Sequence, residues 1–261
     1  MLEKSLSVSA TLSRAIFLDF DGVLFDTVQE AYAVSMTALG RSARIMDIDF
    51  ESNHFKKFSK YRYLISTAWN YYCLIRSIDE KIAQPTIDLE KKFNKSLEQL
   101  QEEYRSLDEN FFQARRHLQK VDCNTWLSLM VPYRFTDDLR SLFSEYQDRF
   151  FLVTTRDRES VERVLHLHQL KVQEGNIFAR DEYAEHNSKV EIIQKLMRSR
   201  EIEESIFVDD FENHLIACDS IEGLLPMQAR WGYVVPDQAE DNSAKILKEI
   251  EKFIYGKNVR A

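Results

Sequence analysis

The sequence predicts an α/β protein whose parallel β-sheet is interrupted, after its first strand, by a long helical insertion. Three observations predict this class. Short apolar runs that end in polar residues occur near the start and in the second half of the 261-residue chain. Helical patterns alternate with these runs from about residue 135 onward, as in parallel sheets covered by helices on both faces. Residues 28–131, by contrast, are rich in helix formers and contain no clear strand.

The chain begins with a polar stretch, and we interpret residues 1–14 as a tail. The first strand is expected over residues 15–20, where an apolar run leads into a turn at Gly22. Similar apolar runs predict four further strands, at 149–154, 176–179, 205–210 and 224–229. Amphipathic patterns predict helices between and after these strands, at 136–147, 158–170, 187–199 and 242–254.

The inserted segment is expected to be helical. From Leu89 to Leu107 the apolar residues recur every three or four positions, which predicts one apolar stripe on a long helix. Pro85 and Thr86 form a start signal, and residues 106–109 have the pattern of a capping box that divides this helix in two. We expect the stripe to pack within the insertion rather than to form a dimer contact. The predicted division of the chain after the tail is a core of residues 15–27 plus 132–261, and an insertion of residues 28–131.

The composition argues against several classes of protein. The formal net charge is −8, which gives no support for nucleic-acid binding. The three cysteines are scattered, which argues against a disulfide framework and a zinc site, and we expect them to be small buried apolar residues. No run has the length and character of a signal peptide or a membrane span. We therefore expect a cytoplasmic protein, monomeric or homodimeric, with no membrane or nucleic-acid partner.

Polar side chains follow each of the three clearest strands: Asp19 and Asp21, then Thr154 and Thr155, then Asp209 and Asp210. Because ligands bind at the C-terminal edge of parallel sheets, we expect these side chains to meet there. Lys189 opens a predicted helix and can reach the same edge. Clustered carboxylates repel one another unless they hold a cation, and Mg²⁺ binds through one or two carboxylates, waters and a substrate phosphate. The pattern therefore predicts magnesium-assisted phosphate chemistry.

These segments resemble the four ordered motifs of the haloacid dehalogenase superfamily, in its phosphatase branch. The matching segments are DFDGVLFDT at 19–27, VTTRD at 153–157, the lone Lys189 and IFVDD at 206–210. The stretch RWGY at 230–233 is similar to phosphoglycolate phosphatase-like members. The likeness covers about 16–27 and 135–235, and it implies a Rossmann-like α/β core with an inserted all-helical cap domain.

The resemblance also implies catalytic roles. Asp19 would be the nucleophile that forms an aspartyl-phosphate, a role that carboxylates can take. Asp21 would be the general acid and base, and Gly22 would permit the turn that positions it. Thr154 would bind the transferring phosphoryl group, and Lys189 would neutralise negative charge on the phosphate and the nucleophile.

The implied metal ion is Mg²⁺, held by Asp19, the backbone carbonyl of Asp21 and Asp210. Asp209 would be an additional ligand or would lie behind the ligands. Many relatives carry a further acid four residues after the metal-binding aspartate, whereas this chain has His214 at that position.

Three residues are candidates for substrate binding. Thr155 and Arg156 stand where small or amide residues are frequent in relatives, so Arg156 either contacts phosphate or pairs with Asp157. The segment 53–73 mixes basic and aromatic residues. It either lines the inner face of the cap, with Arg62 as the first candidate to hold an anionic substrate, or is an ordinary amphipathic helix with its lysines in water.

The predicted function is a Mg²⁺-dependent phosphoric monoester hydrolase that acts on a small phosphorylated metabolite. Two alternatives stay open. A phosphomutase would use the same nucleophile and return the phosphoryl group to its substrate. A non-catalytic binding or regulatory protein would use the same scaffold without turnover.

Overall fold

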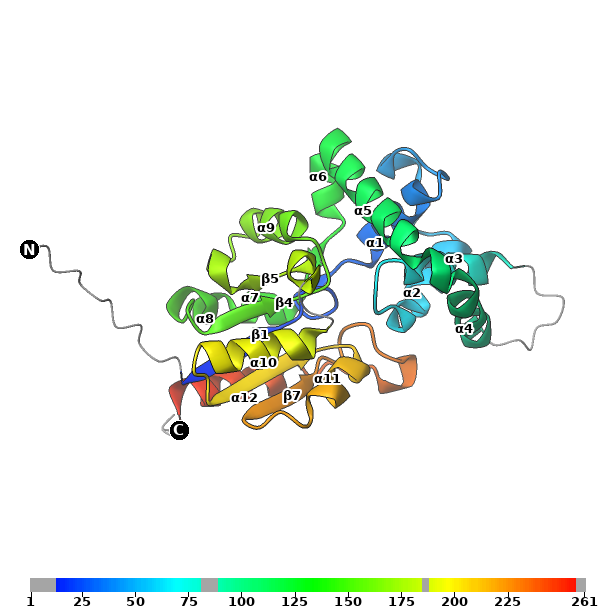
Figure 1. Ribbon diagram of the computed structural model, residues 1–261. Helices are drawn as coiled ribbons and strands as arrows, with labels where there is room; N and C mark the ends of the chain where they lie inside the picture. The colour runs from blue at the N-terminus through cyan, green and yellow to red at the C-terminus, as the bar shows by residue number, and fades with distance from the viewer. Residues whose placement is uncertain (1–12, 81–88, 185–187, 257–261) are drawn as a thin grey trace, which may run out of the picture.

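The computed structural model describes residues 13–80, 89–184 and 188–256, which form an α/β core and a helical cap (Figure 1). Five parallel strands make the central sheet in the order β5-β4-β1-β6-β7. Their bounds are Arg14–Leu18 (β1), Phe150–Val153 (β4), Ile177–Phe178 (β5), Glu204–Asp209 (β6) and Leu224–Gln228 (β7). This order, with the first strand in the centre, confirms the predicted Rossmann-like α/β class.

Helices cover both faces of the sheet because successive strand residues point to opposite sides. On one face Ile16 and Leu18 pack with α7 (Arg134–Asp138), α8 (Arg140–Glu145), α9 (Arg158–Leu167) and α12 (Ser243–Tyr255). On the other face Ala15 and Phe17 pack with α10 (Lys189–Ser199) and α11 (Glu212–Cys218). Short 3-10 turns complete the core, at Glu174–Asn176, Arg180–Ala184 and Pro236–Gln238.

The elements differ from the sequence predictions mainly at their ends. The first strand begins and ends earlier than predicted, so Asp19 and Phe20 lie beyond it in the connecting loop. The helix predicted at 136–147 is two short helices, α7 and α8, that meet at Leu139. The edge strand β7 contains Pro226, which an edge position tolerates because one side of the strand needs no ladder hydrogen bond.

The helical cap is inserted between β1 and β4, as predicted. Its helices are α1 (Val28–Ala38), α2 (Asn53–Lys60), α3 (Asn70–Asp79), α4 (Leu89–Leu100), α5 (Tyr104–Val121) and α6 (Cys123–Ser128). Three 3-10 turns join them, at Ile45–Asp47, Arg62–Leu64 and Gln101–Glu103. Two short antiparallel strands, β2 (Phe25–Asp26) and β3 (Val131–Pro132), pair where the chain enters and leaves the cap. This pairing fixes both connections side by side.

The predicted stripe from Leu89 to Leu107 packs largely within the cap, but the helix divides elsewhere than expected. Phe93 is buried and both ends of the stripe lie half-buried against the same core, whereas Tyr104 is exposed. The break falls at the 3-10 turn Gln101–Glu103, so the predicted capping box at 106–109 is wrong, since Ser106 lies inside α5. The predicted start signal at Pro85 and Thr86 lies outside the described residues.

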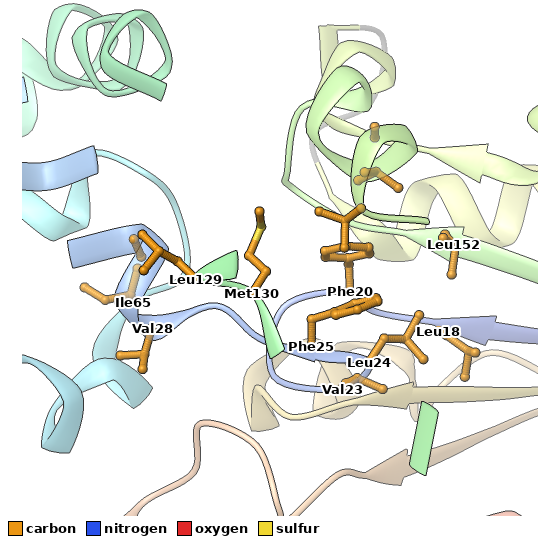
Figure 2. Close-up of a cluster of buried hydrophobic side chains, with 14 of the residues drawn as sticks. Leu18, Phe20, Val23, Leu24, Phe25, Val28, Ile65, Leu129, Met130 and Leu152 are labelled. Atoms are coloured by element: carbon orange, nitrogen blue, oxygen red, sulfur yellow. The ribbon is translucent and has the colours of Figure 1, made fainter. Parts of the chain in front are cut away.

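A continuous apolar cluster joins the sheet to the cap (Figure 2). Leu18 and Leu152 come from neighbouring strands, and the rings of Phe20 and Phe25 stack with their centroids 4.8 Å apart. Met130 and Leu129 continue the cluster toward the cap. The loop that follows β1 is therefore anchored by buried aromatic rings on both sides of Asp21, which holds the candidate catalytic residues on a packed base.

Two sequence expectations concern exposure. Cys73 and Cys218 are buried as expected, but Cys123 is only half-buried, so the expectation was wrong for that residue. None of the helices in the described part of the chain combines the length and the apolar character that crossing a bilayer requires.

Candidate active site

The candidate site lies where the strand order reverses. The connection from β1 through β4 to β5 proceeds toward one edge of the sheet, and β6 returns to the other side of β1. Ligands bind at such switch points in open parallel sheets, because the loops on either side leave a crevice between them. Asp19 follows β1 at this point, and its backbone N–H donates to the carbonyl of Val208 in β6 at 3.0 Å. Asp209, the next residue, ends β6.

Three carboxylates meet in this crevice. One oxygen from each of Asp19, Asp209 and Asp210 lies within 4.8 Å of the others, and all three residues are buried. The Lys189 ammonium lies between two of them, with Nζ 2.7 Å from Asp19 Oδ2 and 2.7 Å from Asp209 Oδ2. Lys189 is itself buried and begins α10, whose N-terminus is capped by Ser188. The predicted cluster of acids and one lysine therefore exists.

Asp209 has both carboxylate oxygens engaged. Oδ1 accepts from the backbone N–H of Phe211 at 2.8 Å, and Oδ2 lies 3.1 Å from Nδ1 of His214 as well as beside Lys189. An ionised carboxylate only accepts hydrogen bonds, so His214 must carry its proton on Nδ1. His214 thus supports Asp209. These bonds turn Asp209 toward Lys189.

The electrostatics of the cluster are unbalanced without a cation. Burial, opposed by Lys189 and reinforced by Asp209, raises the pKa of Asp19 to about 6. Burial and the charges of Asp209 and Asp19 also raise the pKa of Asp210 well above its usual range. Asp209 differs: although burial opposes it, the Lys189 ammonium followed by His214 lowers its pKa. One lysine compensates part of this charge, and a further cation would favour ionisation of Asp19 and Asp210.

Asp210 is held in a narrow cradle of backbone. Its Oδ2 accepts from the N–H of Tyr233 at 2.7 Å. A Cβ placed on Gly22 would lie 2.0 Å from the same oxygen, and one on Gly232 would lie 2.7 Å from the Cβ of Asp210. Gly22 also has φ +83°, which a side chain disfavours. Glycine at both positions lets the chain approach the carboxylate closely enough to fix it.

The residues present fit a hard divalent cation. The acidic cluster supplies oxygen ligands only, as Mg²⁺ prefers, and its three carboxylates are close enough together to share one ion. The cluster can therefore hold a metal ion.

Asp21 is not one of the three clustered carboxylates, so the expectation that all four aspartates meet is wrong for this residue, and its carboxylate pairs with Arg156. Arg156 Nη1 lies 2.7 Å from Asp21 Oδ1, and Nη2 lies 3.0 Å from Glu30 Oε2 of cap helix α1. The alternative in which Arg156 pairs with Asp157 is wrong, because Asp157 instead accepts from Arg115 of cap helix α5 at 3.0 Å. Although burial opposes it, the Arg156 guanidinium lowers the pKa of Asp21. Asp21 is therefore ionised in this arrangement.

The remaining predicted residues surround a small cavity beside Asp21. Its volume is about 40 Å³, and its walls include Asp21, Thr155, Arg156 and, from the cap, Arg62. Thr154 is buried just past the end of β4, where its hydroxyl accepts from the N–H of Arg156 at 3.2 Å. The predicted substrate-binding residues thus lie together.

The segment 53–73 has features of both predicted alternatives, the amphipathic helix and the lining of the site. The segment's lysines lie in water, as the amphipathic-helix alternative expected. Arg62 is instead buried, with its guanidinium 4.4 Å from the ring centroid of Tyr233 and 5.1 Å from that of Tyr71. Part of the segment is therefore solvated while its arginine lines the site.

A larger groove of about 730 Å³ is lined in part by Tyr233 and Asp210. Cap helices α3 and α4 form one wall, and the loops after β6 and β7 form the other. Its lining includes the aromatic residues Tyr63, Trp69, Phe93 and Phe211. Cap and core together therefore form this groove, and Asp210 of the acidic cluster lies in its wall.

Solved structures share this architecture. A predicted phosphatase from Clostridium acetobutylicum aligns with a TM-score of 0.53 and 15% identity, covering 92% of this chain and 99% of that protein. A proposed phosphoglycolate phosphatase from Lactobacillus delbrueckii subsp. bulgaricus aligns at 0.50 and 11%, covering 91% and 98%. A haloacid dehalogenase-like hydrolase from Streptococcus pneumoniae aligns at 0.49 and 15%, covering 90% and 97%.

This chain has the haloacid dehalogenase-like fold. No family model and no curated protein matches its sequence, so the likeness is one of fold. The fold prediction made from the motifs, an α/β core with a helical cap, is confirmed.

Two residues of this candidate site were missed by sequence reasoning. Glu30 and Arg115 belong to the cap, are buried, and connect Asp21 to the cap through Arg156. A signal existed in α5, because Arg115 falls on the face that carries Phe111 and Leu118, and a charge on the apolar face of a helix indicates a buried partner. Glu30 gave no comparable signal, since an acid in the first turn of a helix is ordinary.

Proposed function

We propose that this protein is a Mg²⁺-dependent phosphohydrolase that cleaves a small phosphate monoester through an aspartyl-phosphate on Asp19. One observation carries the proposal: the Asp19 carboxylate lies in a buried acidic cluster, 2.7 Å from the Lys189 ammonium, at the switch point of the sheet. A nucleophilic carboxylate needs a nearby positive charge, and Lys189 supplies it by offsetting the repulsion between Asp19 and an incoming phosphate.

The first half of the reaction forms the covalent intermediate. An oxygen of Asp19 attacks phosphorus, the bond from phosphorus to the ester oxygen breaks, and the leaving oxygen takes a proton from Asp21. The negative charge of a bound phosphate would favour the protonated form of Asp21 at this step, because a nearby like charge opposes ionisation. The second Asp19 oxygen accepts from the N–H of Phe20 at 2.7 Å, which orients the carboxylate. Thr154 and Lys189 would bind the phosphoryl oxygens, so that catalysis rests on positioning and charge.

The second half releases phosphate. A water attacks phosphorus while Asp21 takes its proton, and the bond to Asp19 breaks so that its carboxylate is regenerated. Asp21 is suited to this step because its pairing with Arg156 favours the ionised form that can accept a proton.

Mg²⁺ would be held by Asp19, Asp210 and the backbone carbonyl of Asp21, and when bound it neutralises charge that develops on the phosphoryl oxygens. Asp209 is better suited to orient Lys189 than to bind the ion, because both of its oxygens already accept hydrogen bonds.

Arg62 is the residue we assign to hold the anionic substrate from the cap side, with Thr155 and Arg156 on the core side. The Arg62 Nε is buried and has no hydrogen-bond partner within the described residues. A buried donor without a partner costs about 1–3 kcal/mol, which an oxygen of a bound substrate would recover. The small cavity beside Asp21 favours a small leaving group.

The test is phosphate release from a panel of phosphorylated sugars, nucleotides and small acids, with Mg²⁺ and with EDTA. We expect metal-dependent release from one or a few compounds, lost in Asp19→Asn. The matched control is Asp181→Asn, which neutralises an exposed carboxylate of the core by the same change and should keep full activity. No release from any compound, including an activated aryl phosphate, would refute the hydrolase in favour of a mutase or a non-catalytic protein.

A further inference from the structure

A line of alternating buried charges leads from Asp21 into the cap. Asp21 pairs with Arg156, whose other terminal nitrogen pairs with Glu30. Glu30 in turn accepts from Arg115 Nε at 2.8 Å and Nη2 at 3.1 Å, and from the indole of Trp126 at 2.9 Å. The exposed fractions of Glu30, Arg156 and Arg115 are 0%, 2% and 4%, so water contributes little to their solvation.

Such a network is a poor source of stability. Removing charged groups from water costs free energy that their mutual attraction often fails to exceed, and apolar side chains of similar volume frequently serve as well. The position of the network is more informative than its energy. It crosses from cap helix α1 to the core loop after β4 and ends on the residue that the proposed mechanism uses as acid and base.

The guanidinium of Arg156 is held on several sides. The carboxylates of Asp21 and Glu30 pair with its two terminal nitrogens. Met130 Sδ lies 3.0 Å from Nη2, and the centroid of the Phe20 ring lies 5.6 Å from the central guanidinium carbon. The Asp21 carboxylate has two side-chain partners, Arg156 and Thr27. The orientation of the Asp21 side chain therefore depends in part on Arg156, and that of Arg156 depends on Glu30.

We propose that Glu30 is a positioning residue: by fixing Arg156 it aims the Asp21 carboxylate, so that the cap helix α1 controls proton transfer in the core. This inference rests on the proposed hydrolase function. It assigns to Glu30 no contact with substrate.

The two half-reactions separate this role from a merely structural one. With p-nitrophenyl phosphate, Asp19 attacks phosphorus and the electrons of the bond from phosphorus to oxygen leave on nitrophenolate, which needs no proton. Hydrolysis of the aspartyl-phosphate, by contrast, requires a general base: the attacking water gives its proton to Asp21 as the bond from phosphorus to Asp19 breaks. A misaimed Asp21 therefore slows the second step and spares the first.

The experiment is a rapid-mixing measurement of nitrophenolate release by Glu30→Gln in Mg²⁺. Four N–H groups, three from arginines and one from the indole, donate to the two carboxylate oxygens of Glu30. In glutamine an NH₂ group replaces one of these oxygens and would point its own hydrogens at those donors. We expect one equivalent of nitrophenolate per active site at the wild-type rate, followed by turnover at least about tenfold slower. Glu109→Gln, which removes an exposed carboxylate of α5, should match the wild type.

A smaller burst of nitrophenolate with an unchanged rate per competent site, or kinetics like the wild type, would overturn the positioning role of Glu30. Either result would leave the proposed hydrolase function standing. No nitrophenolate from the wild type would refute the proposed function itself. If Glu30→Gln does not fold, the double variant Glu30→Gln with Arg115→Gln, which removes one negative and one positive charge together, is measured instead. The size of its burst and its later turnover rate then decide in the same way.

Discussion

Replacing Gly22 by alanine tests whether the backbone cradle around Asp210 fixes the acidic cluster. Two effects add. A side chain at φ +83° costs roughly 1–2 kcal/mol because the left-handed region crowds Cβ against the backbone. The new Cβ would also lie 2.0 Å from Asp210 Oδ2 and 2.9 Å from the ring of Tyr233. Real Cβ atoms essentially never lie closer than 3.0 Å to such neighbours, so the carboxylate would have to move by on the order of 1 Å.

Gly40 offers a matched control within the same chain. It has φ +66°, and a Cβ there would meet nothing within 4 Å. Gly40→Ala therefore carries the backbone cost without the contact. We expect urea unfolding to show about 1–2 kcal/mol lost in Gly40→Ala and a larger loss in Gly22→Ala.

The second readout is metal-dependent activity. A displacement near 1 Å at a reacting centre can cost about 100-fold in rate, so Gly22→Ala should lose activity by roughly that factor while Gly40→Ala keeps it. Equal losses of stability in the two variants, with Mg²⁺ response intact in Gly22→Ala, would refute the reasoning, because Asp210 would then not depend on the missing side chain.

Three further outcomes are expected. Because the pKa of Asp19 is raised to about 6 from 3.8, the native state binds the extra proton between these values. Asp19 should therefore contribute a fall on the order of 3 kcal/mol in the free energy of unfolding as pH rises from about 4 to 6 in EDTA, measured as the difference between the wild type and Asp19→Asn. Mg²⁺ should remove this difference. Asp157→Ala should cost about 2–3 kcal/mol in urea unfolding, since it removes both the N-cap of α9 and the partner of Arg115, and Asp157→Asn should recover the cap portion. Tyr233→Phe should lower the melting temperature by an amount equivalent to about 1–3 kcal/mol, because the N–H of Thr27 loses its acceptor; an unchanged melting temperature would contradict this.

Local patterns were sufficient for most of the architecture. The apolar runs at 149–154 and 205–210 could be assigned as strands because both faces of a central parallel strand are buried, which leaves a continuous apolar signal. Ends were less accurate, because hydrogen bonding with neighbouring strands decides where a strand stops. The break in the cap helix was also misplaced: the capping pattern at 106–109 is local, whereas α4, which ends just before the turn at Gln101–Glu103, packs against α3 in the tertiary structure.

The sequence by itself determined most of the charged groups that meet at the edge of the sheet, whereas Glu30 and Arg115 of the cap were missed. Asp19, Lys189 and Asp210 follow strands or open a helix, and the rule that parallel strands end at one edge was enough to predict their meeting. Only the tertiary structure decided their partners. Which carboxylates Arg156 neutralises depends on Glu30, which lies far away in the sequence, and the burial that raises the pKa of Asp19 depends on the assembled core. Charge interactions act through space and strengthen as water is excluded, so they become defined when the cap and the core enclose the site.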